Sequence, residues 1–244
     1  MHSPCAVIPV YNHGHAIASV VAALREQGLP CILVDDGSEP RCTAILDLLR
    51  GEGVILHRRA SNGGKGAAVR DGLMHAAAAG HTHALQIDAD GQHALEDVAR
   101  LLAASRAEPD AMIGGAPVYG DDAPKARVYG RWLTRVWVWI NTLSLDIPDA
   151  MCGFRVYPLR QTLPILPGIS QRMDFDIDIV VRLHWAGVAM RWLPTRVRYP
   201  SDGVSHFRMV ADNARISRVH ARLFAGMLWR APMLLYRRLK EGTR

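Results

Sequence analysis

The sequence lacks the segments that would place the protein in or across a membrane. Its 244 residues contain no run of about 18 uncharged apolar residues, so no transmembrane helix is expected. The first residues include neither a basic segment nor an apolar stretch long enough for a signal peptide, which predicts a cytoplasmic protein. Internal repeats and low-complexity segments are also missing. The length and a hydrophobic content of 49% favour one globular core followed by a tail.

Cysteine is scarce and scattered. The chain has four cysteines with no C-x-x-C pair, namely Cys5, Cys31, Cys42 and Cys152. Three of them lie in or beside apolar runs, which is typical of buried thiols. We therefore expect neither a zinc site nor a disulfide framework.

Two common ligand motifs are incomplete. Residues 62–66 are rich in glycine, but the pattern G-x-x-x-x-G-K-[ST] is absent and Ala67 stands in the place of the required hydroxyl. In the acid-rich segment that begins at Asp88, Gly91 is fourth instead of sixth, and the twelfth residue, Ala99, is not acidic. Hydrolysis of ATP by a phosphate loop and calcium binding by an EF-hand are therefore not expected.

Positive charge is concentrated at the end of the chain. The formal net charge is +6, but residues 204–244 hold nine Lys or Arg against two acids, so the rest is close to neutral. This distribution does not indicate a nucleic-acid partner. In residues 208–244, large apolar residues recur near helical spacing among the basic ones, which predicts a basic amphipathic helical tail interrupted near Pro232.

A second segment has the composition of a membrane surface. Residues 131–139 hold three Trp and two Arg, a combination typical of a headgroup boundary, although ordinary packing on the sheet is the alternative. Together with the tail, this segment predicts peripheral attachment to an anionic membrane surface on the cytoplasmic side.

Short apolar strands alternate with helical stretches between residues 5 and 118, which is typical of an α/β fold with a mainly parallel central sheet flanked by helices. The expected strands are Cys5–Val10, Cys31–Asp35, Val54–His57, His83–Asp88 and Ala111–Pro117. The expected helices are His15–Gln27, Arg41–Arg50, Lys65–Ala79 and Leu95–Ala104. Further on we expect helices over 125–145 and 174–186, strands within 149–158 and 189–200, and the long tail helix.

The most informative residues are two carboxylates one residue apart. Asp88 and Asp90 stand where an apolar strand gives way to a turn at Gly91. Alternate residues of a strand point to the same side, so both acids should leave the sheet together, and Gln92 adds a neutral oxygen. Such hard oxygen ligands suit Mg²⁺ or Mn²⁺. An ordinary acidic surface turn is the alternative, and a phosphatase with an aspartyl nucleophile is a rival from another class.

Other polar residues begin or precede predicted helices. Asp35 or Asp36 could accept hydrogen bonds from a ribose or a base, with an N-cap as the alternative for the second acid. Lys65 adds positive charge where glycines let a helix N-terminus approach a ligand, unless it simply begins the helix. Asp174, Asp176 and Asp178 alternate at another helix start, where we expect Asp174 at the N-cap and consider a second metal site less favoured.

Several segments occur together in the order and spacing of a known family. They are Ala6–Asn12 (AVIPVYN), Leu33–Ser38 (LVDDGS), Asn62–Ala68 (NGGKGAA), Asp88–His93 (DADGQH) and Asp149–Arg155 (DAMCGFR). The set resembles family 2 glycosyltransferases of the GT-A fold, in particular the polyprenol-phosphate sugar transferases. The resemblance covers roughly residues 5–207, which suggests a GT-A domain over 1–207 and a membrane-peripheral tail over 208–244.

The resemblance implies a nucleoside diphosphate sugar as donor and Mg²⁺ or Mn²⁺ as cofactor. The implied donor-binding residues are Pro9, Tyr11, Asn12, Asp35, Asp36, Gly37, Lys65, Asp88 and Ala89. The implied metal ligands are Asp88, Asp90 and Gln92, and His206 is a further candidate for a contact with phosphate or metal, although a lone histidine is more often structural.

The implied reaction is the inverting transfer of a hexose to a lipid-linked acceptor such as a polyprenyl phosphate. An acceptor phosphate is already anionic and needs positioning by a cation, a role that suits Arg155. If the acceptor is instead a hydroxyl of a lipid or glycolipid, Asp149 is the first candidate for general base. Asp149 could equally cap a turn and pair with Arg155. A noncatalytic nucleotide-sugar binding module remains a rival from another class.

Overall fold

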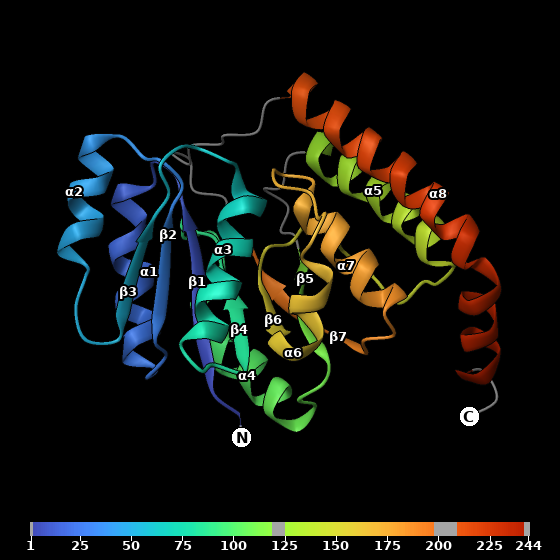
Figure 1. The fold of residues 1–244 in the computed structure, drawn as a ribbon, viewed down its shortest axis with the longest axis horizontal. Coiled ribbons are helices and arrows are strands. Elements are labelled where there is room, and N and C mark those ends of the chain that lie inside the picture. Colours follow the sequence, from blue (N-terminus) through green and yellow to red (C-terminus); the bar gives the residue numbers. More distant parts are fainter. Residues whose placement is uncertain (1, 119–124, 198–208, 242–244) are drawn as a thin grey trace.

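The computed structural model describes residues 2–118, 125–197 and 209–241. Its centre is a seven-stranded sheet in the order β3-β2-β1-β4-β6-β5-β7, with helices on both faces (Figure 1). The strands are β1 (Pro4–Val10), β2 (Cys31–Asp35), β3 (Val54–Arg58), β4 (His83–Gln86), β5 (Met112–Val118), β6 (Arg155–Pro158) and β7 (Met190–Arg196). Strand β6 runs antiparallel to both neighbours, and the other pairs are parallel. The expected mainly parallel α/β architecture is confirmed.

The helices follow the expected alternation. They are α1 (Gly14–Glu26), α2 (Pro40–Leu48), α3 (Lys65–Ala78), α4 (Val98–Ala107), α5 (Lys125–Thr142), α6 (Leu159–Thr162), α7 (Phe175–Trp185) and α8 (Met209–Glu241). Short 3₁₀ turns at Leu95–Asp97 and Leu163–Ile165 precede α4 and follow α6. None of the helices in the described ranges combines the length and apolarity that a membrane crossing requires.

The sheet is buried on both faces because successive residues of each strand enter opposite layers. In β1, Cys5 and Val7 pack with α3 and α7, whereas Ala6 and Ile8 pack with α1, α2 and α4. All four cysteines are buried and free, as expected.

Two predicted boundaries are wrong for identifiable reasons. The strand expected to reach Asp88 ends at Gln86, because its pairing with β6 stops at Arg155, the first residue of that strand. The tail helix is continuous through Pro232 instead of interrupted there. It changes direction in its last turns (Figure 1), as expected where a proline removes one backbone hydrogen bond.

Helix α8 is part of the main core. Its inward face buries Val219, Leu223, Met227 and Leu234 in the same cluster as residues of α5 and α7. Successive positions are four, four and seven residues apart, which places them on one side of the helix.

We expect Leu223→Ala to lower the free energy of unfolding by about 2–5 kcal/mol, because it leaves a cavity in this cluster. Leu228→Ala, on the outer side of the same helix where the side chain is 58% exposed, should change it by less than about 0.5 kcal/mol. Urea denaturation of both variants measures the difference. Equal effects would show that α8 does not pack on the core in solution.

Candidate active site

The carboxyl ends of three parallel strands bring the predicted donor-binding residues to one edge of the sheet. Strand β1 lies between β2 and β4, and Val10 at its end pairs with Asp35 at the end of β2. Tyr11 and Asn12 follow β1, while Asp88 follows β4 after one intervening residue. Edges of this kind are where open α/β sheets bind ligands.

The two acids at the end of β2, Asp35 and Asp36, are buried and hydrogen-bonded within the chain. Asp35 accepts hydrogen bonds from the Ser38 N–H at 2.9 Å and from Arg58 Nε at 2.8 Å. Asp36 accepts the N–H groups of Gly63 at 2.9 Å and Gly64 at 2.8 Å, and therefore fixes the loop that precedes α3. Burial raises the pKa of Asp36 above its usual value despite these hydrogen bonds.

The loops after β1 and β2 are joined around Asn12. Its backbone has a φ of 59°, its N–H donates to Ser38 Oγ at 3.1 Å, and its side-chain oxygen accepts the Glu39 N–H at 2.8 Å. Gly37 has a φ of +77°, and a Cβ there would lie 2.9 Å from the Asn62 nitrogen, so glycine is required. Pro9, Tyr11 and Asn12 remain partly exposed at this rim.

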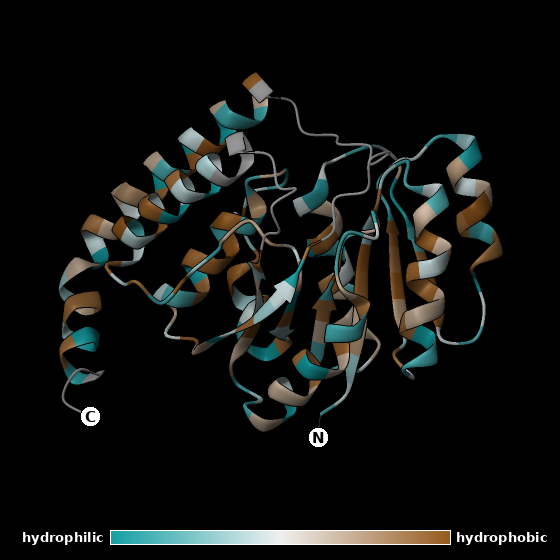
Figure 2. Ribbon diagram, turned by 180° about the vertical axis from the view of Figure 1, so that it is seen from behind, coloured by the Kyte–Doolittle hydropathy of each residue, from teal (hydrophilic) through white to brown (hydrophobic). Residues whose placement is uncertain are grey.

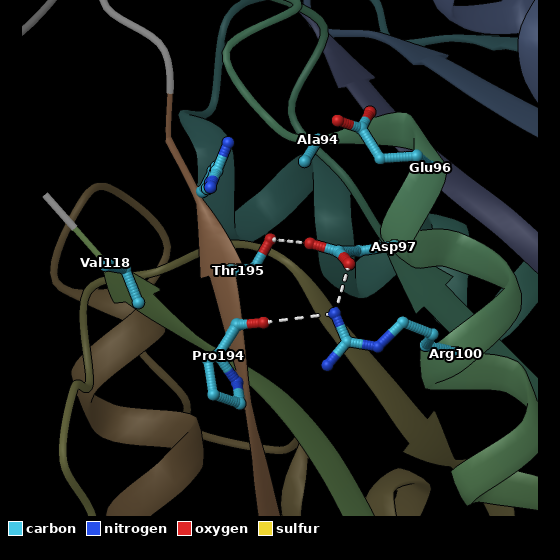
Figure 3. Close-up of a pocket in the computed structure, with 8 residues that line it drawn as sticks. Ala94, Glu96, Asp97, Arg100, Val118, Pro194 and Thr195 are labelled. Carbon is cyan, nitrogen blue, oxygen red and sulfur yellow. Dashed lines mark hydrogen bonds and ion pairs between the residues drawn. The ribbon is translucent and has the colours of Figure 1, made fainter. Parts of the chain in front are cut away.

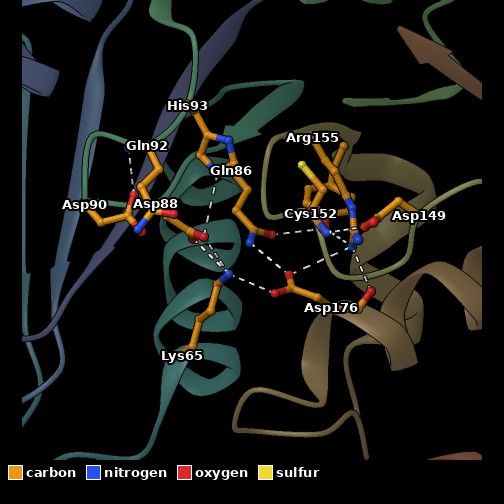
Figure 4. Close-up of polar contacts among 11 residues, drawn as sticks. Lys65, Gln86, Asp88, Asp90, Gln92, His93, Asp149, Cys152, Arg155 and Asp176 are labelled. Atoms are coloured by element: carbon orange, nitrogen blue, oxygen red, sulfur yellow. Dashed lines mark hydrogen bonds and ion pairs between the residues drawn. The ribbon is translucent and has the colours of Figure 1, made fainter. Parts of the chain in front are cut away.

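A partly buried ion cluster forms the centre of the edge (Figure 4). Lys65, the first residue of α3, lies 2.9 Å from both carboxylate oxygens of Asp88. The same ammonium nitrogen lies 2.8 Å from Asp176 Oδ2 on α7. Gly153 packs directly against the pair, since a Cβ there would lie 2.7 Å from Lys65 Nζ and 2.8 Å from the nearer Asp88 oxygen.

The electrostatics of the pair keep Lys65 and Asp88 ionised. Burial alone would lower the pKa of Lys65, but Asp176 and Asp88 raise it above its usual value. Burial alone would raise the pKa of Asp88, but Lys65 and the nearby His93 lower it well below its usual range. His93 also stacks on Phe154, with ring centroids 5.0 Å apart.

A polar network extends from Asp176 into the sheet. Gln86 Nε2 donates to Asp176 Oδ1 at 3.1 Å, and the Tyr157 hydroxyl donates to Gln86 Oε1 at 3.0 Å. Arg155 Nη1 donates to the Asp176 carbonyl at 2.8 Å and to the Tyr157 hydroxyl at 3.3 Å. The sequence analysis places Asp176 at a helix start and considers a second metal site there less favoured. The alternation of Asp174, Asp176 and Asp178 pointed to this segment. The sequence does not show that β6 runs antiparallel, which is what brings α7 to this edge.

The three acids at the start of α7 have separate roles. Asp174 occupies the N-cap position, but its side chain makes no capping hydrogen bond. Asp178 accepts Arg182 Nε at 2.7 Å and Arg222 Nη2 at 2.6 Å, so it joins α7 to α8.

The proposed metal ligands offer hard oxygens at the open side of the cluster. Asp90 is partly exposed, and its Oδ1 accepts the Gln92 N–H at 3.0 Å across the turn at Gly91. Ala89 between the two acids is buried. Two carboxylates and one amide oxygen fit Mg²⁺ or Mn²⁺ by their chemistry. No group of three or more His, Cys, Asp or Glu in the described ranges is arranged around a metal position, and Lys65 is the cation at Asp88. His206 lies outside the described residues.

All residues of the DAMCGFR segment are buried except Met151, which is partly buried. Asp149 accepts the N–H groups of Met151 at 2.8 Å and Cys152 at 2.7 Å, and Arg131 of α5 at 2.8 Å. It therefore caps its own turn and is paired with Arg131, not with Arg155. Arg155 is fully buried, and its Nε and Nη2 have no hydrogen-bond partner among the described residues.

A cavity of about 360 Å³ lies between α4 and the ends of β5 and β7 (Figure 3). Its inner wall is the buried carboxylate of Asp97, which accepts Thr195 Oγ1 at 2.8 Å and Arg100 Nη1 at 2.5 Å. Because these bonds occupy both oxygens of Asp97, they connect α4 to β7 and do not leave that carboxylate open to a ligand.

The sequence matches known glycosyltransferases. Residues 5–163 match the family described as glycosyl transferase family 2. The chain is 27% identical over 227 residues to the polyprenol monophosphomannose synthase of Mycolicibacterium smegmatis, which covers 86% of this chain and 82% of that protein. It is 29% identical over 186 residues to the undecaprenyl-phosphate mannosyltransferase of Micrococcus luteus, with coverages of 72% and 75%. Against glycosyltransferase AglJ of Haloferax volcanii the identity is 26% over 204 residues, and the alignment spans 82% of this chain but 64% of AglJ.

Solved structures share the fold. Mannosyl-3-phosphoglycerate synthase from Rubrobacter xylanophilus superposes with a TM-score of 0.67 at 14% identity, over 95% of this chain and 75% of that one. Glucosyl-3-phosphoglycerate synthase from Mycobacterium tuberculosis superposes with a TM-score of 0.66 at 15% identity, over 93% of this chain and 80% of that one. That structure is a complex with Mn²⁺, uridine diphosphate and glucosyl-3-phosphoglycerate. The expected GT-A fold is confirmed.

We expect Tyr157→Phe to lower the free energy of unfolding by about 1–3 kcal/mol, because it leaves Gln86 Oε1 buried without its donor. Tyr236→Phe on the exposed side of α8 is the matched control and should change stability by less than about 0.5 kcal/mol. Urea denaturation measures both values. If the two variants are equally stable, the hydrogen bond at Gln86 contributes nothing measurable.

Proposed function

Because the chain belongs to glycosyl transferase family 2, we propose that it transfers a hexose from a nucleoside diphosphate sugar to a lipid-linked phosphate with the help of a divalent cation. The observation that carries the proposal is the position of Asp88 and Asp90 at the sheet edge beside Lys65. Membership of the family sets aside the aspartyl phosphatase and the noncatalytic module.

The donor would lie across the ends of β1, β2 and β4. Pro9, Tyr11 and Asn12 offer a partly exposed rim for the nucleoside. Asp35 and Asp36 support this rim from beneath, since their carboxylates hold the Gly37 turn and the loop before α3. Lys65 is the cation nearest to the place where a diphosphate would meet Asp88.

Asp88, Asp90 and Gln92 would hold Mg²⁺ or Mn²⁺. When bound, the cation stabilises the negative charge that develops on the leaving diphosphate. The chain's own contribution is to hold the two carboxylates in place: the Gly91 turn positions Asp90, and the close packing of Gly153 restricts Asp88.

The names of two relatives support a lipid phosphate as the acceptor. These relatives are named for polyprenol or undecaprenyl phosphate. The buried Nε and Nη2 of Arg155 are two donors without partners in the described chain, which suits a guanidinium that turns toward an anion. Asp149 already accepts three hydrogen bonds, so both of its oxygens are engaged within the chain, which favours a phosphate acceptor over a hydroxyl acceptor.

We further propose that α5 and α8 together meet an anionic membrane surface. The outward face of α8 is apolar, opposite its buried face, and the exposed apolar residues are Phe224, Leu228, Trp229, Leu235, Tyr236 and Leu239. Helix α5 exposes Tyr129, Trp132, Leu133 and Ile140. Trp137 joins the two faces, because its ring lies edge-on to Phe224 with centroids 6.5 Å apart.

Basic residues flank this apolar face. The helical spacing places Arg215, Arg222 and Lys240 along one border of the α8 stripe. Apolar and polar residues both occur along α8 (Figure 2). At a headgroup boundary the apolar side chains can enter the lipid while the basic side chains contact the phosphates. A second copy of the chain would bring like charges together.

The donor proposal predicts that Asp90→Ala loses Mn²⁺-dependent binding of UDP- or GDP-sugars and loses sugar transfer to polyprenyl phosphate. Calorimetry of donor binding with Mn²⁺ and with EDTA measures the first effect, and radiolabelled sugar in the lipid phase measures the second. Glu96→Ala removes a nearby carboxylate outside the motif and is the control that should retain both. Unchanged donor affinity in EDTA would contradict the metal assignment.

The membrane proposal predicts that Trp229→Glu lowers affinity for vesicles of phosphatidylglycerol and phosphatidylcholine by about tenfold or more. The side chain is 88% exposed, so the variant should keep the fold. Burying a large apolar side chain contributes about 1.5–3 kcal/mol, and about 1.4 kcal/mol corresponds to a factor of ten.

Vesicle flotation measures this binding. Leu48→Glu on α2 places the same charge at an 85% exposed leucine far from this face and should float like the wild type. If both variants float equally, the α5–α8 face is not the membrane contact.

A further inference from the structure

The geometry points to Lys65 as a built-in substitute for the divalent cation: it occupies Asp88 until metal and donor arrive together, and Asp176 retains it when it leaves. This inference rests on the proposed function. Its consequence is that metal and donor bind interdependently, with Lys65 opposing the binding of metal alone.

The ammonium of Lys65 lies against both oxygens of Asp88. Its nitrogen lies 2.9 Å from each oxygen, donates a hydrogen bond to Oδ2 and leaves Oδ1 without a hydrogen-bond partner among the described residues. A second cation at either oxygen would therefore be repelled by Lys65. The side chains are partly buried, and Gly153 closes the space around them so tightly that even a methyl group would meet both partners within 3 Å. A metal ion at Asp88 would therefore lie next to the Lys65 ammonium unless that side chain moves toward Asp176.

Asp176 provides the place to which Lys65 can withdraw. Its Oδ2 lies 2.8 Å from the same nitrogen, while Gln86 holds its other oxygen at 3.1 Å. Lys65 can thus give up Asp88 without becoming an unpaired buried charge, which would be costly. Asp176 is in this sense a positioning residue for Lys65.

The charges explain why donor and metal should arrive together. Lys65 pairs with Asp88 and Asp176, and Arg155 lies 3.9 Å from Asp176, so these two cations and two carboxylates are neutral together. A divalent ion alone would add two positive charges beside two existing cations. The diphosphate of a donor carries negative charge that compensates the metal and the displaced Lys65.

The residue type supports an exchangeable contact. Lys65 is one of three lysines, with Lys125 and Lys240, in a chain whose other basic residues are arginines. An ammonium is a compact point charge on a flexible stem and can change partners, whereas a guanidinium has a rigid planar fork. The narrow space beside Gly153 holds the ammonium of Lys65.

The test is the affinity of Mn²⁺ alone, measured by electron paramagnetic resonance of the free ion in titrations with and without UDP or GDP. Lys65→Met keeps the length of the side chain and removes the charge. We expect it to bind Mn²⁺ without nucleotide about fivefold or more tightly than the wild type, and to show a smaller gain on adding nucleotide. Couplings between sites are commonly about 5- to 150-fold.

Lys240→Met makes the same substitution near the end of α8 and should leave Mn²⁺ affinity unchanged, which separates the local effect from net charge. If Lys65→Met unfolds, Lys65→Gln carries the same expectation. Equal or weaker Mn²⁺ binding by a folded Lys65 variant would overturn the inference while leaving the transferase proposal intact. If neither nucleotide changes Mn²⁺ affinity in the wild type, the proposed donor site itself is wrong.

Discussion

The pairing of Lys65 with two carboxylates from different parts of the chain is the interaction on which the architecture of the edge depends. Asp88 belongs to the parallel half of the sheet, whereas Asp176 begins α7 after the antiparallel strand β6. Charges removed from water are stabilised only when each has partners with good geometry. Here Gln86 donates a hydrogen bond to the Asp176 carboxylate and Arg155 lies 3.9 Å from it, so the two halves of the fold are fixed relative to each other.

The sequence predicted the parts of this edge that follow from local pattern. The apolar strands and the acids at their ends could be located because period-two alternation and glycine turns act over a few residues. The hydrogen-bond partners of each carboxylate could not be predicted in this way. Asp36 binds the N–H groups of Gly63 and Gly64, 27 and 28 residues away in the chain, and Asp149 pairs with Arg131 instead of Arg155. Such choices depend on which loops meet in the folded protein.

The role of Asp176 was hidden for the same reason. From the sequence, it is one of three alternating acids at a helix start, where acids are favoured by the helix dipole alone. Its contact with Lys65 spans 111 residues and requires β6 to run antiparallel beside β4. Strand direction is a property of the whole sheet, and no local pattern in a strand as short as Arg155–Pro158 specifies it.

Helix α8 shows how one amphipathic sequence can serve two contacts. The spacing of apolar residues predicted the helix. It could not tell which apolar face packs on the core, because the buried face and the exposed face have similar sequence patterns. The ion pair of Arg222 with Asp178 selects the orientation, because Asp178 is buried and also accepts the N–H of Ser170 at 2.8 Å. The next residue, Gln171, accepts the Ala67 N–H of α3 at 2.8 Å. The helix proposed to meet the membrane is therefore joined, through one buried carboxylate and one loop, to the helix that carries Lys65. The proposed lipid-facing surface and the proposed donor edge thus belong to a single packed unit.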